Sequence, residues 1–130
     1  MAKQQVTLDS IPVGPLGIIA LESSKNIGQK VNNYITEWRK ERVLEDTTGI
    51  SVGDYRKDSY LVESQCPRFG SGEAKGIIRS SVRGDDIYIL LDVTNYSITY
   101  TVSGHLNHMS PDDHYQDLKR VIAAMAGKAR

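Results

Sequence analysis

Two short segments carry the side chains best suited to binding chemistry. The first, RFGSGE, places Phe69 four residues before Glu73, and the second, SSVRGDD, places Ser81 two residues before Arg83. An aromatic ring can stack on a base and a carboxylate can accept hydrogen bonds from a base edge. A guanidinium beside a hydroxyl and turn amides suits a phosphate. Taken alone, the residues allow core packing of the Phe69 ring equally well, and they favour a solvated Glu73 carboxylate and a plain connecting turn at Ser81 and Arg83.

Three histidines raise the question of a metal site. They lie in SGHLNHMSPDDHYQ together with two aspartates, as His105, His108, His114, Asp112 and Asp113. Their spacing fits no defined zinc pattern. An exposed polar loop followed by a helix with Asp112 or Asp113 as its N-cap is the better interpretation, and we expect no metal site. The sequence also contains no phosphate-binding P-loop, nucleophile elbow or cysteine pair.

Length and composition narrow the class of protein. The 130 residues with 39% apolar content fit one domain with a modest core. Sixteen basic residues balance sixteen acidic ones, so no overall charge attracts nucleic acid or anionic lipid. The single Cys66 favours a reducing compartment, hence the cytoplasm. The first ten residues lack a signal-peptide core and no apolar run reaches the ~20 residues that span a bilayer, so we expect no membrane association.

The first half of the sequence predicts one strand and one amphipathic helix. LGIIAL at residues 16–21 is an apolar run bounded by turn residues. A helix with Ser24 as N-cap and its last turn near Lys40 follows. Its apolar residues recur at helical spacing and are Ile27, Val31, Tyr34, Ile35 and Trp38. Residues 41–59 are polar and turn-rich and are interpreted as a loop.

The second half predicts three short strands and a second helix. The strands are expected at residues 60–63, 74–79 and 86–91, and the helix at residues 112–126, after a loop over residues 93–111. The apolar strand IYILL suits the centre of a sheet covered on both faces. We therefore expect an α/β layered domain with a mostly parallel sheet flanked by helices. A helix of such a sheet normally leads to another parallel strand, so the chain looks like part of a longer protein.

Together these segments resemble the N-terminal domain of ribose-phosphate pyrophosphokinases, the PRPP synthetases. The resemblance rests on the succession of RFGSGE, SSVRGDD, the apolar strand IYILLD and the helix that begins at PDD. The family shows Phe-Ser-Asp-Gly-Glu, then Glu-Ser-Val-Arg-Gly, an apolar strand and a helix that starts at Asn-Asp-Asn. The match covers residues 60–130, and residues 16–41 more loosely. It implies a phosphoribosyltransferase-like, Rossmann-like fold, with residues 1–130 as a single N-terminal domain.

The resemblance implies roles for five residues. Phe69, Ser71 and Glu73 stand at family positions that contact the adenine of ATP in a neighbouring subunit. Ser71 replaces an aspartate or asparagine, and as a shorter, uncharged group it predicts weaker base selectivity. Ser81 and Arg83 stand at positions that bind a phosphate of an effector in many family members. The trans arrangement of the adenine site also implies a homo-oligomer.

The family's reaction transfers the diphosphoryl group of Mg-ATP to ribose 5-phosphate and yields PRPP and AMP. The Mg²⁺ ligands and the ribose-phosphate loop of the family lie mainly in a second domain, which this chain lacks, so no catalytic residue is expected here and the isolated chain should be inactive. Leu91 stands where the family has glutamine, and the loop over residues 93–111 is longer. These departures leave a second hypothesis open, a non-catalytic regulatory or assembly domain of the same fold.

Overall fold

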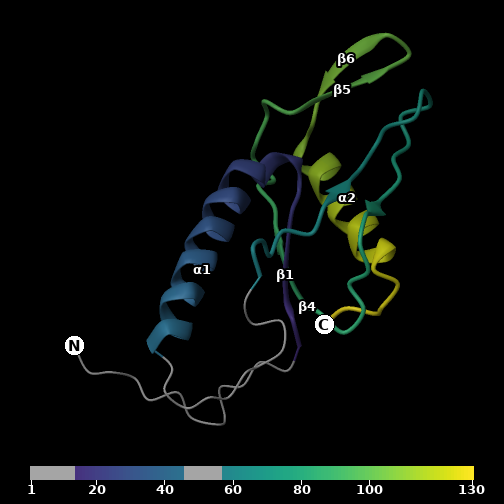
Figure 1. The fold of residues 1–130 in the computed structure, drawn as a ribbon. Helices are drawn as coiled ribbons and strands as arrows, with labels where there is room; N and C mark the ends of the chain where they lie inside the picture. Colours follow the sequence, from purple (N-terminus) through teal and green to yellow (C-terminus); the bar gives the residue numbers. More distant parts are fainter. Residues whose placement is uncertain (1–13, 46–56) are drawn as a thin grey trace.

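Two parallel strands form the centre of the molecule, and the computed structural model describes residues 14–45 and 57–130 around them. The fold is a small α/β arrangement with two helices and short parallel and antiparallel sheets (Figure 1). In chain order the elements are β1 (Leu16–Ala20), the 3₁₀ turn η2 (Glu22–Ser24), α1 (Lys25–Glu45), β2 (Ser64–Gln65), β3 (Ile77–Ile78), β4 (Asp86–Leu90), β5 (Thr99–Val102), β6 (His105–His108) and α2 (Pro111–Ala124). Neither helix is both long enough and apolar enough to cross a bilayer, as far as the described residues go.

The central pairing joins β1 to β4 in parallel, in register from Leu16 opposite Asp86 to Ala20 opposite Leu90. On the other edge of β1, Ile18 forms a single parallel bridge with Leu61. The predicted strand at 60–63 is therefore wrong in extent, since only this bridge forms there. The open edge of β4 is met by Arg130, whose N–H donates to Asp85 and whose carbonyl accepts from Ile87, at 2.8 and 2.7 Å.

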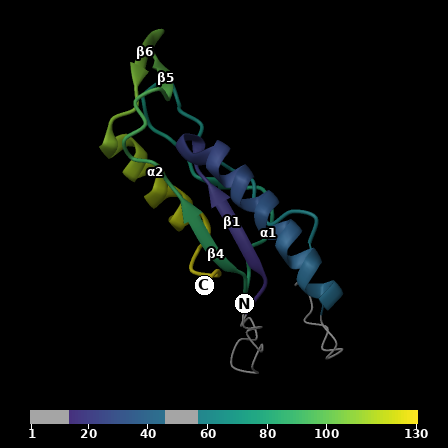
Figure 2. The ribbon, with the colours of Figure 1, turned by 90° about the vertical axis from the view of Figure 1, so that its left-hand side faces the viewer.

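The main core lies between this sheet and α2. Ile19, Leu21 and Val121 are buried there and pack against half-buried apolar side chains of β4 and α2. Helix α1 lies across the strands from α2, so that β1 and β4 stand between the two helices in both views (Figures 1 and 2). Tyr88 of β4 shares its sheet face with Ile18, yet Tyr88 is 63% exposed and Ile18 only 2%. On the face of the sheet that packs against α1, the side chain of Ile18 in β1 is thus buried, whereas that of Tyr88 in β4 is exposed to solvent.

Helix α1 does not bury the stripe that its sequence pattern predicted. Its buried residues are Gly28, Asn32 and Thr36, whereas Tyr34 and Trp38 are 71% and 46% exposed. The Oδ1 atom of Asn32 accepts a hydrogen bond from the backbone N–H of Tyr60 at 2.7 Å, and the face of α1 with Asn32 therefore turns inward. Gly28 permits a close approach, because a Cβ there would lie 2.4 Å from Cβ of Ala20.

Three further boundaries differ from the prediction. The segment 93–111 contains the β5–β6 hairpin, which turns at Ser103 and Gly104 with φ of 48° and 81°. The expected strand at 74–79 shrinks to β3, which pairs antiparallel with β2, so the sheets are not mostly parallel. Helix α1 extends to Glu45, beyond the expected end near Lys40. The rest of the predicted loop, at 46–56, lies outside the described residues.

The start of α2 is fixed by a capping box. Ser110 is the N-cap, and its hydroxyl accepts from the N–H of Asp113 while the Asp113 carboxylate accepts from the N–H of Ser110. The cap is thus Ser110, and the prediction of Asp112 or Asp113 is wrong by two or three positions. Burial raises the pKa of the Asp113 carboxyl, but the hydrogen bonds from Ser110 outweigh this and hold the pKa below its usual value.

Replacing the cap should destabilise the fold in a pH-dependent way. We expect Ser110→Ala to cost about 1 kcal/mol in urea unfolding at neutral pH, because the Asp113 N–H loses its acceptor and the Asp113 carboxylate loses the hydroxyl that donates to it. Since the folded pKa of Asp113 is lowered, its stabilisation is present at neutral pH and is lost as the pH falls through that pKa. The difference between variant and wild type should therefore shrink in acid. Ser80→Ala is the matched control, and an equal effect of both variants would contradict this account.

Candidate functional site

The predicted base-contacting residues lie at the tip of an antiparallel ribbon. Its two arms pair through β2 and β3 and through a bridge between Arg68 and Ala74. At the tip the N–H of Phe69 donates to the carbonyl of Glu73 at 2.7 Å, and Gly72 adopts a φ of 91° that favours glycine. Phe69 is 50% exposed, and Ser71 and Glu73 are exposed as well. The structure therefore brings the three residues into one outward turn, and the alternative of core packing for Phe69 is wrong.

The β5–β6 hairpin supports this turn, which the sequence did not reveal. The Ser103 hydroxyl donates to the carbonyl of Gly70 at 3.4 Å. The two γ-methyl groups of Val102 lie 3.6 and 3.8 Å from the position of a Cβ on Gly72. Each contact joins two chain segments that are about thirty residues apart in the sequence. The β5–β6 hairpin within the segment 93–111 thus packs against the ribbon tip.

A buried ion-pair network anchors the base of the tip. Arg68 binds the Asp117 carboxylate of α2 at 3.1 Å with both side chains only 10% exposed, and Arg120 binds the same carboxylate at 2.7 Å. The guanidinium of Arg68 also lies 4.7 Å from the centre of the Tyr100 ring. Burial raises the pKa of Asp117, although both arginines oppose the shift. The network joins the ribbon, α2 and the hairpin at one point.

The only cysteine lies in the pocket beside this network. Cys66, Arg68, Tyr100, His114 and Asp117 are among the side chains that line the pocket. Burial, and then the charge of Asp117, raise the pKa of the Cys66 thiol to about 11. The thiolate is therefore scarce at neutral pH.

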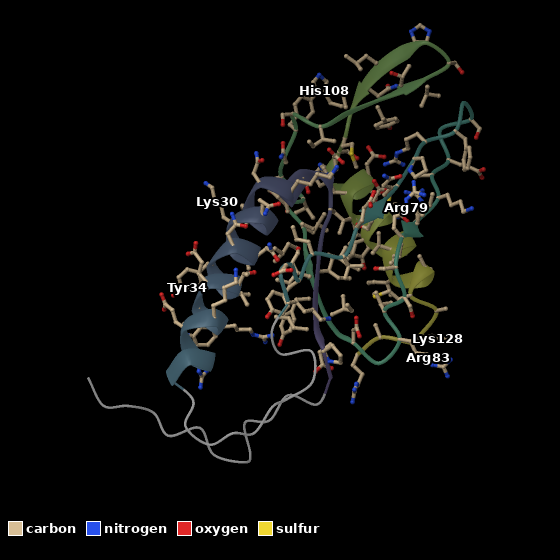
Figure 3. All side chains as sticks on the ribbon, in the orientation of Figure 1. Lys30, Tyr34, Arg79, Arg83, His108 and Lys128 are labelled. Carbon is tan, nitrogen blue, oxygen red and sulfur yellow. The ribbon has the colours of Figure 1, made fainter. Side chains whose placement is uncertain are left out.

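The second predicted site is a separate turn at the start of β4. Ser81 and Arg83 are exposed on either side of buried Val82, and the N–H of Arg83 donates to the Ser81 hydroxyl at 3.4 Å. The N–H of Gly84 donates to the carbonyl of Lys128 at 2.9 Å. Figure 3 shows the labelled Arg83 and Lys128 side by side, away from the ribbon tip. The sequence did not single out Lys128, because its proximity depends on how α2 returns to the sheet.

Two of the three histidines, His108 and His114, make separate structural contacts. His108 stacks on Tyr96 with ring centres 4.3 Å apart, and its Nδ1 lies 2.8 Å from the Tyr96 carbonyl. His114 is buried, with Nε2 2.8 Å from the carbonyl of Asn95. Among the residues that the structure describes, no group of three or more His, Cys, Asp or Glu side chains could hold a metal ion.

Comparison with known proteins identifies the family. Residues 16–130 match the family described as the N-terminal domain of ribose phosphate pyrophosphokinase. The chain therefore belongs to this family. Searches of the curated proteins and of the solved structures found no match.

The ion-pair network predicts that two arginines of the ribbon contribute differently to the free energy of unfolding. Arg68→Ala should lower the free energy of unfolding by about 2 kcal/mol, because it leaves a buried carboxylate with only Arg120 as ionic partner. Arg79→Ala is the matched control, since the Arg79 guanidinium is exposed and lies 3.9 Å from Glu63, and it should change stability by less than about 0.5 kcal/mol. Urea titration measures both variants. Equal losses would show that the network does not anchor the tip.

Proposed function

We propose that this chain is the N-terminal domain of a ribose-phosphate pyrophosphokinase that makes PRPP and AMP from Mg-ATP and ribose 5-phosphate in the cytoplasm. Family membership over residues 16–130 supports the class of reaction. The parallel β1–β4 pair between two helices agrees with a Rossmann-like, phosphoribosyltransferase-like layering. A free Cys66 suits a reducing compartment.

The outward turn at the ribbon tip is the observation that carries this proposal. Phe69 exposes half of its surface at the tip, where it is available to a ligand held by another molecule. In the proposed complex the ring stacks on adenine, while Ser71 and Glu73 accept hydrogen bonds from the base edge. The nucleotide itself sits in a neighbouring subunit, so the domain functions in a homo-oligomer.

The turn at the start of β4 is proposed to bind a regulatory phosphate. The Arg83 guanidinium and the Ser81 hydroxyl are both exposed at this turn, and Lys128 adds a second cation nearby. Two cations and a hydroxyl form a suitable site for an anion. The pairing of Gly84 with Lys128 holds the turn in place before any ligand arrives.

The diphosphoryl transfer needs Mg²⁺ and cations at the transferring phosphates. We propose that a second domain supplies most of these groups and binds ribose 5-phosphate, so that the 130-residue chain alone is inactive. The alternative is a non-catalytic regulatory or assembly domain of the same family. Leu91 and the β5–β6 hairpin favour this alternative, because they depart from the family pattern in the segment that follows β4.

The adenine role predicts a specific kinetic change in the enzyme that contains this domain. Phe69→Ala and Glu73→Ala should each raise KM for ATP roughly tenfold with kcat unchanged, because base contacts stabilise the bound and transition states equally. Arg79→Ala, in the same ribbon but away from the tip, should leave KM unchanged. Unchanged KM in the tip variants, or a fall in kcat alone, would refute the role.

The phosphate role predicts a ligand-dependent melting temperature. Phosphate should raise the melting temperature of the wild-type chain, because an anion that binds only the folded state stabilises it. Arg83→Ala and Lys128→Ala should each reduce this rise, while Arg79→Ala should retain it. An undiminished rise in the Arg83 variant would leave that residue as a turn residue only.

A further inference from the structure

A line of apolar side chains runs along the outside of α1. Ile27, Tyr34 and Trp38 are 56%, 71% and 46% exposed, and Val31 is half-buried between them. These four residues, here called the α1 stripe, are separated by four, three and four positions. Such spacing places them on one side of a helix. Figure 3 shows the labelled Tyr34 and Lys30 pointing away from the sheet.

The separations between the four residues of the α1 stripe are the same when counted from either end of the helix. If two such helices pack antiparallel about a two-fold axis, residue i of one copy lies opposite residue 65 minus i of the other. Ile27 then faces Trp38 of the second copy, and Val31 faces Tyr34. Each apolar side chain thus meets another apolar side chain, as an isologous contact requires.

The charges beside the α1 stripe fit the same arrangement. Lys30 and Glu37 are exposed, and both lie along the outer edge of the stripe. In the antiparallel pair, Glu37 of the second copy lies opposite position 28, two residues or about 3 Å along the axis from Lys30. Two-fold symmetry repeats this pairing, so the dimer gains two pairs of opposite charge. A parallel pair about a two-fold axis would instead place Lys30 and Glu37 of the two copies on opposite flanks of the contact, where they would not pair.

We propose that the α1 stripe is the interface of a homodimer in which α1 packs antiparallel on α1 of a second copy. This surface is independent of the ribbon tip and of the proposed enzymatic function. Because the tip lies at the hairpin end of the molecule and the α1 stripe on the outer side of α1, one chain can use both surfaces at once (Figure 1). A single pair of helices buries less surface area than a standard protein interface. We therefore expect a dissociation constant in the micromolar rather than the nanomolar range.

Sedimentation equilibrium of the 130-residue chain, from low micromolar to near millimolar, tests the apolar contact. The wild type should pass from monomer to dimer, and Tyr34→Glu should remain monomeric because it places two carboxylates in the apolar contact. Asn33→Glu is the matched control, exposed and adjacent but outside the α1 stripe, and it should dimerise like the wild type. Circular dichroism verifies that each variant is folded, and Ile27→Lys provides a second disruption of the stripe.

A charge exchange tests the antiparallel direction. Lys30→Glu and Glu37→Lys should each weaken the dimer about tenfold, because each variant creates two pairs of like charge. The double variant should restore the wild-type dissociation constant. Lys40→Glu, exposed on α1 but farther around the helix from the α1 stripe, should have no such effect.

These measurements test both the interface and the antiparallel direction of the two helices. A wild type that stays monomeric, or a dimer that persists in both Tyr34→Glu and Ile27→Lys, would overturn the interface. A dimer in which the double charge variant is no tighter than the single variants would overturn the antiparallel arrangement.

Discussion

The hydrogen bond from the backbone N–H of Tyr60 to the side chain of Asn32 sets the orientation of α1, and much of the molecular surface follows from it. Both residues are buried, and an unpaired amide there would cost about 1 to 3 kcal/mol. Asn32 must therefore face the sheet, and Gly28, one turn earlier, packs closely against Ala20. Helix α1 consequently uses its small and polar side for the intramolecular contact, and the α1 stripe is left on the surface.

The two proposed ligand sites depend on contacts that are distant in sequence. The ribbon tip is held by the Arg68–Asp117 ion pair and by the β5–β6 hairpin, while the turn at Arg83 is held by the chain after α2. In both sites the side chains proposed to bind a ligand are exposed on a turn. Such exposure is what the proposed function requires, since the ribbon tip would meet a nucleotide held by a neighbouring copy.

The sequence predicted elements whose signals are local. The apolar runs of β1 and β4 and the helix over 111–124 appear within two residues of their expected bounds. RFGSGE forms an exposed turn, whereas the sequence had left core packing of Phe69 open. The orientation of α1 was mispredicted, because periodicity identifies an apolar stripe but not a buried Asn32 whose partner lies 28 residues away. The β5–β6 hairpin was missed because β6 is polar, with His105, Asn107 and His108 in four positions. The polar content of 93–111 therefore looked like an ordinary loop.

The central claim is that the α1 stripe is exposed to solvent in a single copy. At high protein concentration, a second copy covers it. Trp38 is the only tryptophan in the sequence and lies in the α1 stripe, so its fluorescence reports this surface alone. Quenching of that fluorescence by acrylamide, measured across a dilution series, tests the claim directly. The account predicts efficient quenching in dilute solution and protection as the concentration rises. Protection at every concentration would mean that Trp38 is covered within one chain, and it would contradict the orientation of α1 described here.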